Sequence, residues 1–342
     1  MTSHLIAGTK RWIYELLVVK HYRLTYRLSE GTGFLVQSLQ RRKANDLVFV
    51  VFIKGKGWIL ETICKQIAQY FSGQTAFHYS AFRLPQATSY FFAHYSFLQI
   101  CLKLNPQLWS RRLFVFYTHP REEEVNSDDL VYALNRAEQI FCMNSQSVEA
   151  LAALGVERRR LSCLIGGADP AVFRAHRRGS GCVGFCAAYY ERKSPDTILA
   201  IVEALPQRQF ILIGRGWHSY PQFARLAGLT NFVYVEPEYN TYPDYYAQMD
   251  VFVSAAKLEG GPIPLIETMM CNIVPVASRT GFAPDIIEHG VNGFLFDVDA
   301  DVSAICELIE QAFHLAGDIY PSVAPYTWQE FATRCLTVIE ST

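Results

Sequence analysis

From residue 45 onward, short apolar runs alternate with segments of helical periodicity, and this alternation restricts the fold more than any other feature. Residues 47–53 form the first run, and a helix is predicted to follow at 58–71. Strands that alternate with helices build parallel sheets with helices on both faces. The sequence therefore predicts an α/β protein, with further strands at 113–117, 139–143, 161–165, 182–187, 209–213, 232–235, 251–254 and 273–277.

The chain has 342 residues, which is enough for two such domains. The clearest break is the Gly-Gly-Ala-Asp-Pro sequence at 166–170, followed by a basic, Gly- and Ser-containing stretch at 174–181, which we interpret as an interdomain hinge. A helix is predicted to begin at Pro195, capped by Ser194. We expect a basic N-terminal segment, two domains and a C-terminal helix, at 1–44, 45–172, 173–325 and 326–342.

Composition excludes several classes of protein. Half of the residues are hydrophobic and 18% are charged, which excludes a disordered or collagen-like chain. The net charge of -1 gives no global field that would recruit nucleic acid. The nine cysteines lack the paired spacings of a zinc site, so no metal site is predicted. Their odd number, without a signal peptide, favours a reducing compartment, and we expect a cytoplasmic protein.

The N-terminal segment has two open interpretations. Residues 1–44 carry eight basic and two acidic side chains, interleaved with aromatic and aliphatic ones. Such a segment suits a helix on an anionic membrane surface, and equally a basic element packed on the first domain. Residues 84–102 carry no charge, but their Pro, Ser, Thr, Gln and His residues favour a helix or loop of a soluble domain over a membrane span.

The most informative stretch is 251–276. A strand is predicted to end near Ser254, a loop to hold Glu259, Gly260 and Gly261, and a helix to begin at Pro264 and carry Glu267. Two glycines let backbone N–H groups approach a ligand, and a helix N-terminus presents partial positive charge. This arrangement predicts a phosphate site.

The stretch resembles the E-x7-E motif of retaining, nucleotide-sugar-dependent glycosyltransferases of family 4. These have the GT-B fold, in which two Rossmann-like domains face each other across a cleft and a C-terminal helix crosses back to the first domain. Other segments resemble the family in the same order, namely 116–119, 144–145, 191–195, 211–216, 280–285 and 290–295. The resemblance covers 115–340 well and 45–115 loosely.

The resemblance implies a role for individual residues. Glu259 and His119 would lie near the transferred sugar, and Glu267 would bond the ribose hydroxyls. Lys193 and Arg192 would neutralise the diphosphate. The other residues expected at the donor are Gly214 beside the nucleotide, Glu236 near the base, and the backbone of Gly260, Gly261, Ile263 and Leu265. Gly55 and Gly57 loosely match the family's acceptor-side loop.

Two departures from the family stand beside these matches. No basic residue occupies 187–189, where the family usually has an arginine, and Asp285 stands where glutamate is commoner. The Gly-x-Gly sequences at 31–33, 55–57 and 214–216 lack the third glycine of a dinucleotide fingerprint, so a dehydrogenase is poorly supported. The Asp-rich sequence at 297–301 lacks the glycine and glutamate of a calcium loop.

The expected activity is transfer of a hexosyl group from a nucleotide-diphosphate sugar to a glycan or lipid-linked glycan in cell-envelope synthesis. No metal or cofactor is expected, and the cytoplasmic face of the membrane is the expected location if residues 1–44 bind lipid. Two alternatives remain open from the sequence. One is a sugar-nucleotide 2-epimerase with two similar domains, and the other is a nonenzymatic sugar-nucleotide-binding scaffold.

Overall fold

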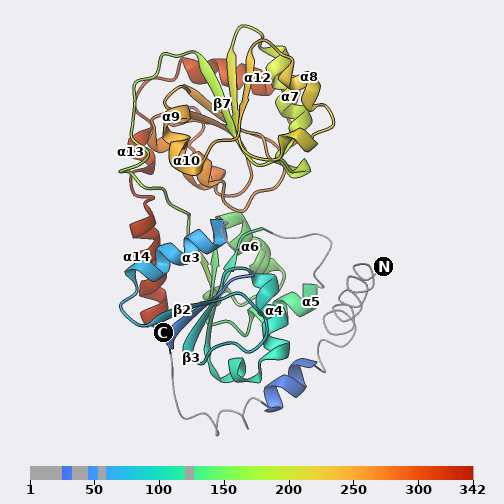
Figure 1. Ribbon diagram of the computed structural model, residues 1–342, viewed down its shortest axis with the longest axis vertical. Helices are drawn as coiled ribbons and strands as arrows, with labels where there is room; N and C mark the ends of the chain where they lie inside the picture. The colour runs from blue at the N-terminus through green and yellow to red at the C-terminus, as the bar shows by residue number, and fades with distance from the viewer. Residues whose placement is uncertain (1–24, 33–44, 53–58, 120–126, 342) are drawn as a thin grey trace. The chain divides into compact units, whose positions relative to one another are not determined.

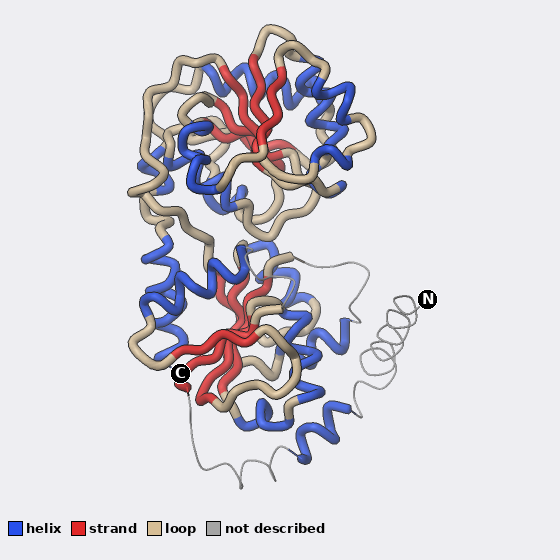
Figure 2. The backbone as a smooth tube through the Cα atoms, in the orientation of Figure 1, coloured by secondary structure: helices blue, strands red, loops and turns tan. Residues whose placement is uncertain are grey.

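The computed structural model describes residues 25–32, 45–52, 59–119 and 127–341 (Figures 1 and 2). The chain divides into two compact units. Unit 1 comprises Met1–Leu164 and Ala332–Thr342, and unit 2 comprises Ile165–Phe331. The predicted acceptor-side glycines Gly55 and Gly57, and most of the basic segment 1–44, lie outside the described residues.

Unit 1 is built on a sheet of six parallel strands in the order β2-β1-β3-β4-β5-β6. Its central strands are apolar along most of their length because helices cover both faces. The strands are β1 (Asn45–Val50), β2 (Thr75–His78), β3 (Ala87–Phe92), β4 (Arg112–Tyr117), β5 (Gln139–Cys142) and β6 (Leu161–Cys163).

Figure 1 shows α4 and α5 on one side of this sheet and α3 and α14 on the other. The helices of unit 1 are α3 (Ile59–Tyr70), α4 (Tyr95–Leu104), α5 (Ser127–Leu134), α6 (Ser145–Ala153), the 3-10 turns η3 (Pro106–Ser110) and η4 (Arg158–Arg160), and a helix at 25–32. The C-terminal helix α14 (Trp328–Ser341) belongs to unit 1 from Ala332 onward, as the sequence predicted.

The uncharged stretch 84–102 is split between two elements of unit 1. Strand β3 takes its first half, and α4 begins at Tyr95 after His94, whose side chain accepts a hydrogen bond from the Ser96 N–H. The described residues include no helix long and apolar enough to span a membrane. The stretch is therefore apolar because it supplies the core of unit 1.

Unit 2 has a second sheet of six parallel strands, in the order β12-β11-β10-β7-β8-β9. Its strands are β7 (Cys182–Cys186), β8 (Gln209–Ile213), β9 (Phe232–Val235), β10 (Val251–Ser254), β11 (Val274–Ser278) and β12 (Phe294–Phe296). The edge strands β2 and β12 and the interior strand β3 were not predicted. Strand β3 lies in the uncharged stretch 84–102, where a helix or loop was predicted, and β2 and β12 are edge strands of four and three residues.

The helices of unit 2 follow the predicted alternation. They are α7 (Pro195–Ala204), α8 (Phe223–Ala227), α9 (Tyr242–Tyr246), α10 (Ile263–Met270), α11 (Ala283–Ile286), α12 (Val302–Phe313), α13 (Tyr320–Val323) and the 3-10 turns η5 (Glu191–Lys193), η6 (Trp217–Ser219) and η7 (Tyr239–Thr241). Helix α12 buries Ile305, Ile309 and Ala312, at helical spacing, and packs on α7 and β11.

The predicted start of α7 at Pro195 is confirmed, but the predicted cap is wrong. Ser194 is left-handed, with φ at 55°, and its side chain makes no capping hydrogen bond. Its backbone N–H instead donates to the Glu191 carbonyl and closes η5. Ser194 is therefore used to turn the chain from Lys193 into the helix.

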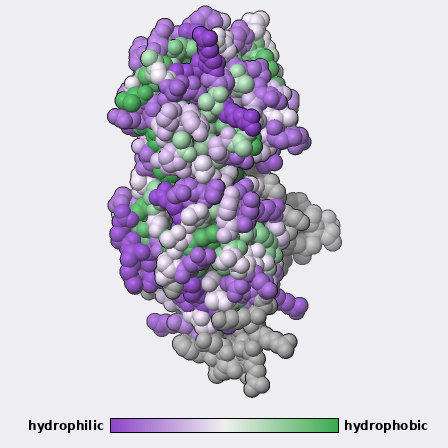
Figure 3. Space-filling model, turned by 90° about the vertical axis from the view of Figure 1, so that its left-hand side faces the viewer, coloured by the Kyte–Doolittle hydropathy of each residue, from purple (hydrophilic) through white to green (hydrophobic). Residues whose placement is uncertain are grey.

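The exposed apolar side chains are dispersed. On the face drawn in Figure 3, hydrophilic side chains predominate and hydrophobic ones form small separate groups. The largest exposed fractions among the described apolar residues belong to Phe82, Leu28 and Val291, which come from different parts of the sequence. Single exposed apolar residues are normal on a protein surface.

Candidate active site

The predicted donor residues lie in loops that follow the carboxyl ends of neighbouring strands of unit 2. Lys193 lies in the connection after β7, Gly214 directly follows β8, and Glu259 lies in the loop after β10. Because β7 pairs with both β8 and β10 in parallel, these three loops emerge at one edge of the sheet. Ligands of open parallel sheets bind at this edge.

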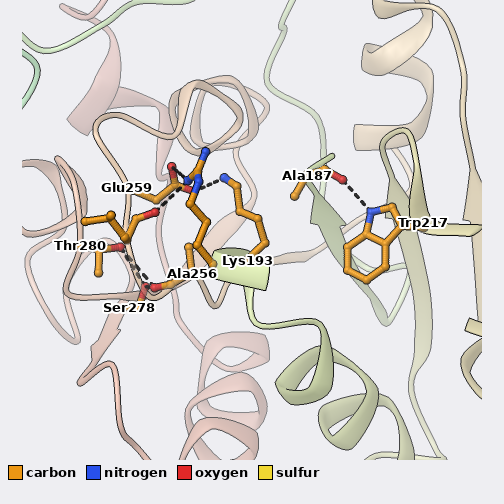
Figure 4. Close-up of polar contacts among 9 residues, drawn as sticks. Ala187, Lys193, Trp217, Ala256, Glu259, Ser278 and Thr280 are labelled. Carbon is orange, nitrogen blue, oxygen red and sulfur yellow. Dashed lines mark hydrogen bonds and ion pairs between the residues drawn. The ribbon is translucent and has the colours of Figure 1, made fainter. Parts of the chain in front are cut away.

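Glu259 lies between two cations (Figure 4). Its carboxylate forms an ion pair with the Lys193 ammonium, and its other oxygen lies 3.2 Å from a guanidinium nitrogen of Arg192. The same nitrogen donates to the Leu258 carbonyl at 2.8 Å. Glu259 is only 9% exposed, so the two cations compensate a carboxylate that is largely removed from water. The structure thus brings together three of the residues that the sequence singled out.

The turn after β11 contacts the loop that carries Glu259. The Ser278 hydroxyl donates to the Ala256 carbonyl at 2.6 Å and lies 3.1 Å from the Thr280 hydroxyl (Figure 4). Gly281 follows with φ at 56°, and a Cβ there would lie 3.0 Å from the Glu259 Cβ. Sequence analysis gave these residues no role at the site. The supporting contacts join segments more than twenty residues apart, which a local motif does not show.

Glu267 is buried inside unit 2, within α10. Its carboxylate accepts hydrogen bonds from the Tyr239 hydroxyl at 2.5 Å and from the Tyr246 hydroxyl at 3.0 Å. Burial raises the pKa of Glu267 to about 7, and the two phenols counter that rise. Burial and the neighbouring carboxylate also raise the pKa values of both phenols, which therefore remain neutral donors.

Both tyrosines were missed at the sequence level. The only signal was the spacing of Tyr239, Tyr242 and Tyr246, which places three aromatic residues on one helical face. Cys186, at the end of β7, lies beside the same group. Burial raises the pKa of its thiol to about 12, so this cysteine stays protonated and is a poor nucleophile.

Gly214 is required by a close approach of two backbone segments. It has φ at 147°, and a side chain there would collide with the Ala187 carbonyl. That carbonyl also accepts a hydrogen bond from the Trp217 indole at 2.8 Å (Figure 4). The loops after β7 and β8 are therefore locked together.

The remaining predicted residues are placed as follows. Glu236 is exposed after β9 and accepts a hydrogen bond from the Tyr234 hydroxyl at 2.9 Å. Gly260 and Gly261 precede α10, and the buried side chains of Ile263 and Leu265 leave only their backbone for a ligand. The Leu265 N–H already donates to the Pro262 carbonyl. His119 follows β4 in unit 1, and its carbonyl accepts a hydrogen bond from the Tyr95 hydroxyl at 3.3 Å.

Two cavities bear on what unit 2 can bind. One, of about 30 Å³, is lined by Lys193, Cys186, Pro262 and Pro264 and has room for a water molecule but not for a sugar. The other, of about 290 Å³, lies by Arg178 and Asp250 at the amino ends of β7 and β10, away from the predicted residues. Within the part of the chain that the structure describes, no cluster of His, Cys, Asp and Glu residues is suited to a metal ion.

Residues 180–312 match the family described as glycosyl transferases group 1. No curated protein matches the chain in sequence.

Solved structures match over both units. Anabaena HepE in complex with UDP superposes with a TM-score of 0.70 at 16% identity, covering 87% of this chain and 100% of that one. Sucrose-phosphate synthase from Thermosynechococcus elongatus gives a TM-score of 0.69 at 14% identity, with 88% and 99% covered. The lipopolysaccharide outer core galactosyltransferase WaaB gives 0.67 at 12% identity, with 86% and 99% covered. Residues 180–312 thus match the glycosyl transferases group 1 family, and the chain has the predicted two-domain GT-B fold.

Proposed function

We propose that the protein is a retaining glycosyltransferase that moves a hexosyl group from a nucleotide-diphosphate sugar to a glycan or lipid-linked glycan. The observation that carries this proposal is the contact of Lys193 and Arg192 with Glu259, inside the segment that matches the glycosyl transferases group 1 family. UDP is the first nucleotide to test, since Anabaena HepE was solved with UDP and with UDP-glucose.

The reaction separates charge, and residues around Glu259 can stabilise both the negative phosphate and the positive sugar carbon. Departure of the nucleoside diphosphate leaves negative charge on its terminal phosphate, while the sugar carbon gains positive character. Fixed cations such as Lys193, together with the N-terminus of α10, stabilise the phosphate without reorganising. A carboxylate such as Glu259 stabilises or orients the sugar. Because side chains supply this positive charge, we propose that the reaction needs no metal.

The ion pair itself links donor binding to the carboxylate. Without a donor, Lys193 and Glu259 neutralise each other. A diphosphate competes for Lys193, and the carboxylate released from the pair is then available to the sugar. In this scheme Glu236 lies near the base and Glu267 near the ribose, and the backbone of 260–265 and Gly214 line the donor. His119 and the glycines at 55 and 57 would serve the sugar and the acceptor.

The acceptor side of the proposal rests on charge. Residues 1–44 are strongly basic and contain apolar side chains, a composition that binds anionic lipid surfaces. We therefore propose that the protein works at the cytoplasmic face of a membrane on a lipid-linked or soluble glycan. Flotation with anionic vesicles, compared with neutral ones, tests this part separately.

The activity test incubates the full chain with UDP-, GDP- and ADP-hexoses and a mixture of glycan acceptors, with and without EDTA. Release of nucleoside diphosphate, a new glycosidic bond, and an anomeric configuration by NMR that matches the donor are expected. Glu259→Gln should lower the rate at least about a hundredfold. Glu310→Gln, which changes a carboxylate in a half-buried ion pair with Arg208, is the matched control and should retain activity. Full activity of Glu259→Gln would contradict the proposal.

A further inference from the structure

The two phenols that contact Glu267 bond different oxygens of its carboxylate. The Tyr239 hydroxyl donates to Oε1, and the Tyr246 hydroxyl donates to Oε2. Glu267 is 1% exposed, so each carboxylate oxygen depends on its phenol rather than on water. A ligand that bonds Glu267 therefore replaces one of these donors or shares an oxygen with it.

Tyr246 is held by the core. Its side chain is fully buried, and its ring lies 5.8 Å from that of Phe173 and 6.0 Å from that of Tyr242. Phe173 is itself 1% exposed. The Tyr246 hydroxyl leaves Oε2 only if this packing opens, so Tyr246 is a fixed support for the carboxylate.

Tyr239 packs on the same rings, with centroids 6.1 Å from Phe173 and 5.2 Å from Tyr242, but it is less enclosed than Tyr246. It is 53% exposed and lies at the start of η7, in a turn whose neighbours Glu238 and Asn240 are also exposed. The turn is closed by the Thr241 N–H, which donates to the Glu238 carbonyl at 3.0 Å. The Tyr239 hydroxyl can leave Oε1 by movement of this surface turn, which breaks the ring contacts of Tyr239 but leaves the contact between Phe173 and Tyr246 in place.

We propose that Tyr239 is a displaceable occupant of the ribose position, and that a ribose hydroxyl takes its place on Oε1 when a nucleotide binds. This inference rests on the proposed function, which assigns Glu267 to the ribose. One hydroxyl donor replaces another, so the buried carboxylate stays paired with and without ligand. Tyr246 holds Oε2 throughout and is a positioning residue.

The exchange lowers nucleotide affinity and favours product release. The ribose gains its bond to Glu267 only at the expense of the phenol's bond, so the net gain is small. When the nucleoside diphosphate leaves, Tyr239 returns to Oε1. An enzyme that releases a nucleoside diphosphate at every turnover benefits from such a competitor, because uniformly tight binding does not raise its rate.

The test is calorimetry of the full chain with UDP, GDP and ADP and with their 2′,3′-dideoxy counterparts. Tyr239→Phe removes the competing hydroxyl and keeps the ring, so the ribonucleotide that binds the wild type should bind about fivefold more tightly or better. Its dideoxy counterpart should change by less than about twofold, since it makes no bond to Glu267. Nucleotide dissociation should slow in the same variant.

Tyr246→Phe is the matched control, because it removes the other phenol hydroxyl from the same carboxylate. It should not tighten binding, since no ligand replaces a donor locked in the core. Equal or weaker ribonucleotide binding by Tyr239→Phe, or equal tightening of the dideoxy compound, would overturn the inference while leaving the proposed function in place. Failure of every nucleotide to bind the wild type would instead overturn the proposed function, and this inference with it.

Discussion

Lys193 and Glu259, 66 positions apart in the chain, form an ion pair within unit 2. Lys193 ends the η5 turn after β7, and Glu259 lies in the loop after β10. Because β7 and β10 are neighbouring strands, the ion pair joins the loops at their carboxyl ends. Arg192 holds the other carboxylate oxygen. The proposed phosphate ligand Lys193 is thus paired with a carboxylate in the absence of a donor, and this pairing determines what each substitution should do.

Lys193→Ala should weaken binding of nucleoside diphosphates about tenfold to a hundredfold, because a charge-assisted hydrogen bond to phosphate is lost. Binding of the free nucleoside, which has no phosphate, should change little. Calorimetry with UDP and with uridine separates the two effects. Arg225→Ala removes an exposed cation that pairs with Glu203 in the same unit and should leave both affinities unchanged. Equal weakening of uridine and UDP would show that Lys193 acts on the fold and not on phosphate.

The sequence predicted the strands and loops that carry the candidate site residues, but not the hydrogen-bond partners of those residues. The runs at 182–187, 209–213 and 251–254 were found because buried parallel strands are apolar along their length. The position of Glu259 in a loop and of Glu267 in a helix followed from the glycines and prolines between them. These are local signals, and they correctly placed Glu259 in a loop and Glu267 in a helix.

Long-range partners were beyond such reasoning. The phenols on Glu267 come from 28 and 21 residues upstream, and each reaches the carboxylate only after a strand has intervened. Ser278 and Gly281 likewise act on the Glu259 loop through packing between β10 and β11. Ser194 was assigned as a cap from its residue type, whereas the tight turn after Lys193 uses its backbone instead. Tertiary contacts decided each of these cases.

Glu267 should make unit 2 less stable as the pH rises. Burial raises its pKa from the ordinary 4.5 to about 7, so between these values the folded protein keeps a proton that the unfolded chain releases. The free energy of unfolding is then highest below pH 4.5 and falls by about 3 kcal/mol toward pH 7 from this group. Urea unfolding of the wild type and of Glu267→Gln at pH 4.5 and 7.5 measures it.

In that comparison Glu267→Gln should lose less stability than the wild type over the same interval, because an amide does not titrate. Other groups titrate equally in both proteins, so only the difference between the two is read. Parallel losses in the two proteins would show that Glu267 has the same pKa in the folded and the unfolded chain.

Gly281→Ala should impair catalysis more than it impairs folding. Gly281 has φ at 56°, and an added Cβ would lie 3.0 Å from the Glu259 Cβ and 3.1 Å from the Gly260 carbonyl oxygen. The variant should lose about 1–2 kcal/mol from its left-handed backbone and also displace the Glu259 loop. A displaced catalytic group commonly lowers the rate about a hundredfold.

Gly290→Ala separates backbone strain from displacement. Gly290 has φ at 79°, but an added Cβ there meets no atom within 4 Å. This variant should lose a similar amount of stability in urea unfolding while keeping its sugar-transfer rate. If both alanine variants transferred sugar equally well, contact with Gly281 would not position Glu259.

Removing one partner of the buried Lys103–Asp129 ion pair should strongly destabilise unit 1. Their ion pair joins α4 to α5, with Nζ and Oδ2 3.1 Å apart and both side chains 2% exposed. Burial lowers the pKa of Lys103 and raises that of Asp129, while the pairing opposes both changes. Removing one partner leaves an uncompensated buried charge, so Asp129→Ala should cost about 3–5 kcal/mol.

The double variant Lys103→Met with Asp129→Leu tests whether the cost comes from the lone charge. It removes both charges and keeps most of the volume, so it should be more stable in urea than Asp129→Ala, despite carrying one more substitution. The Lys103 ammonium also lies 4.8 Å from the centre of the Tyr26 ring, an interaction that methionine retains only in part. A double variant as unstable as the single one would mean that the pair contributes through its hydrogen bond and packing. Recovery of stability would show instead that each of these buried charges is tolerated in unit 1 only because the other one compensates it.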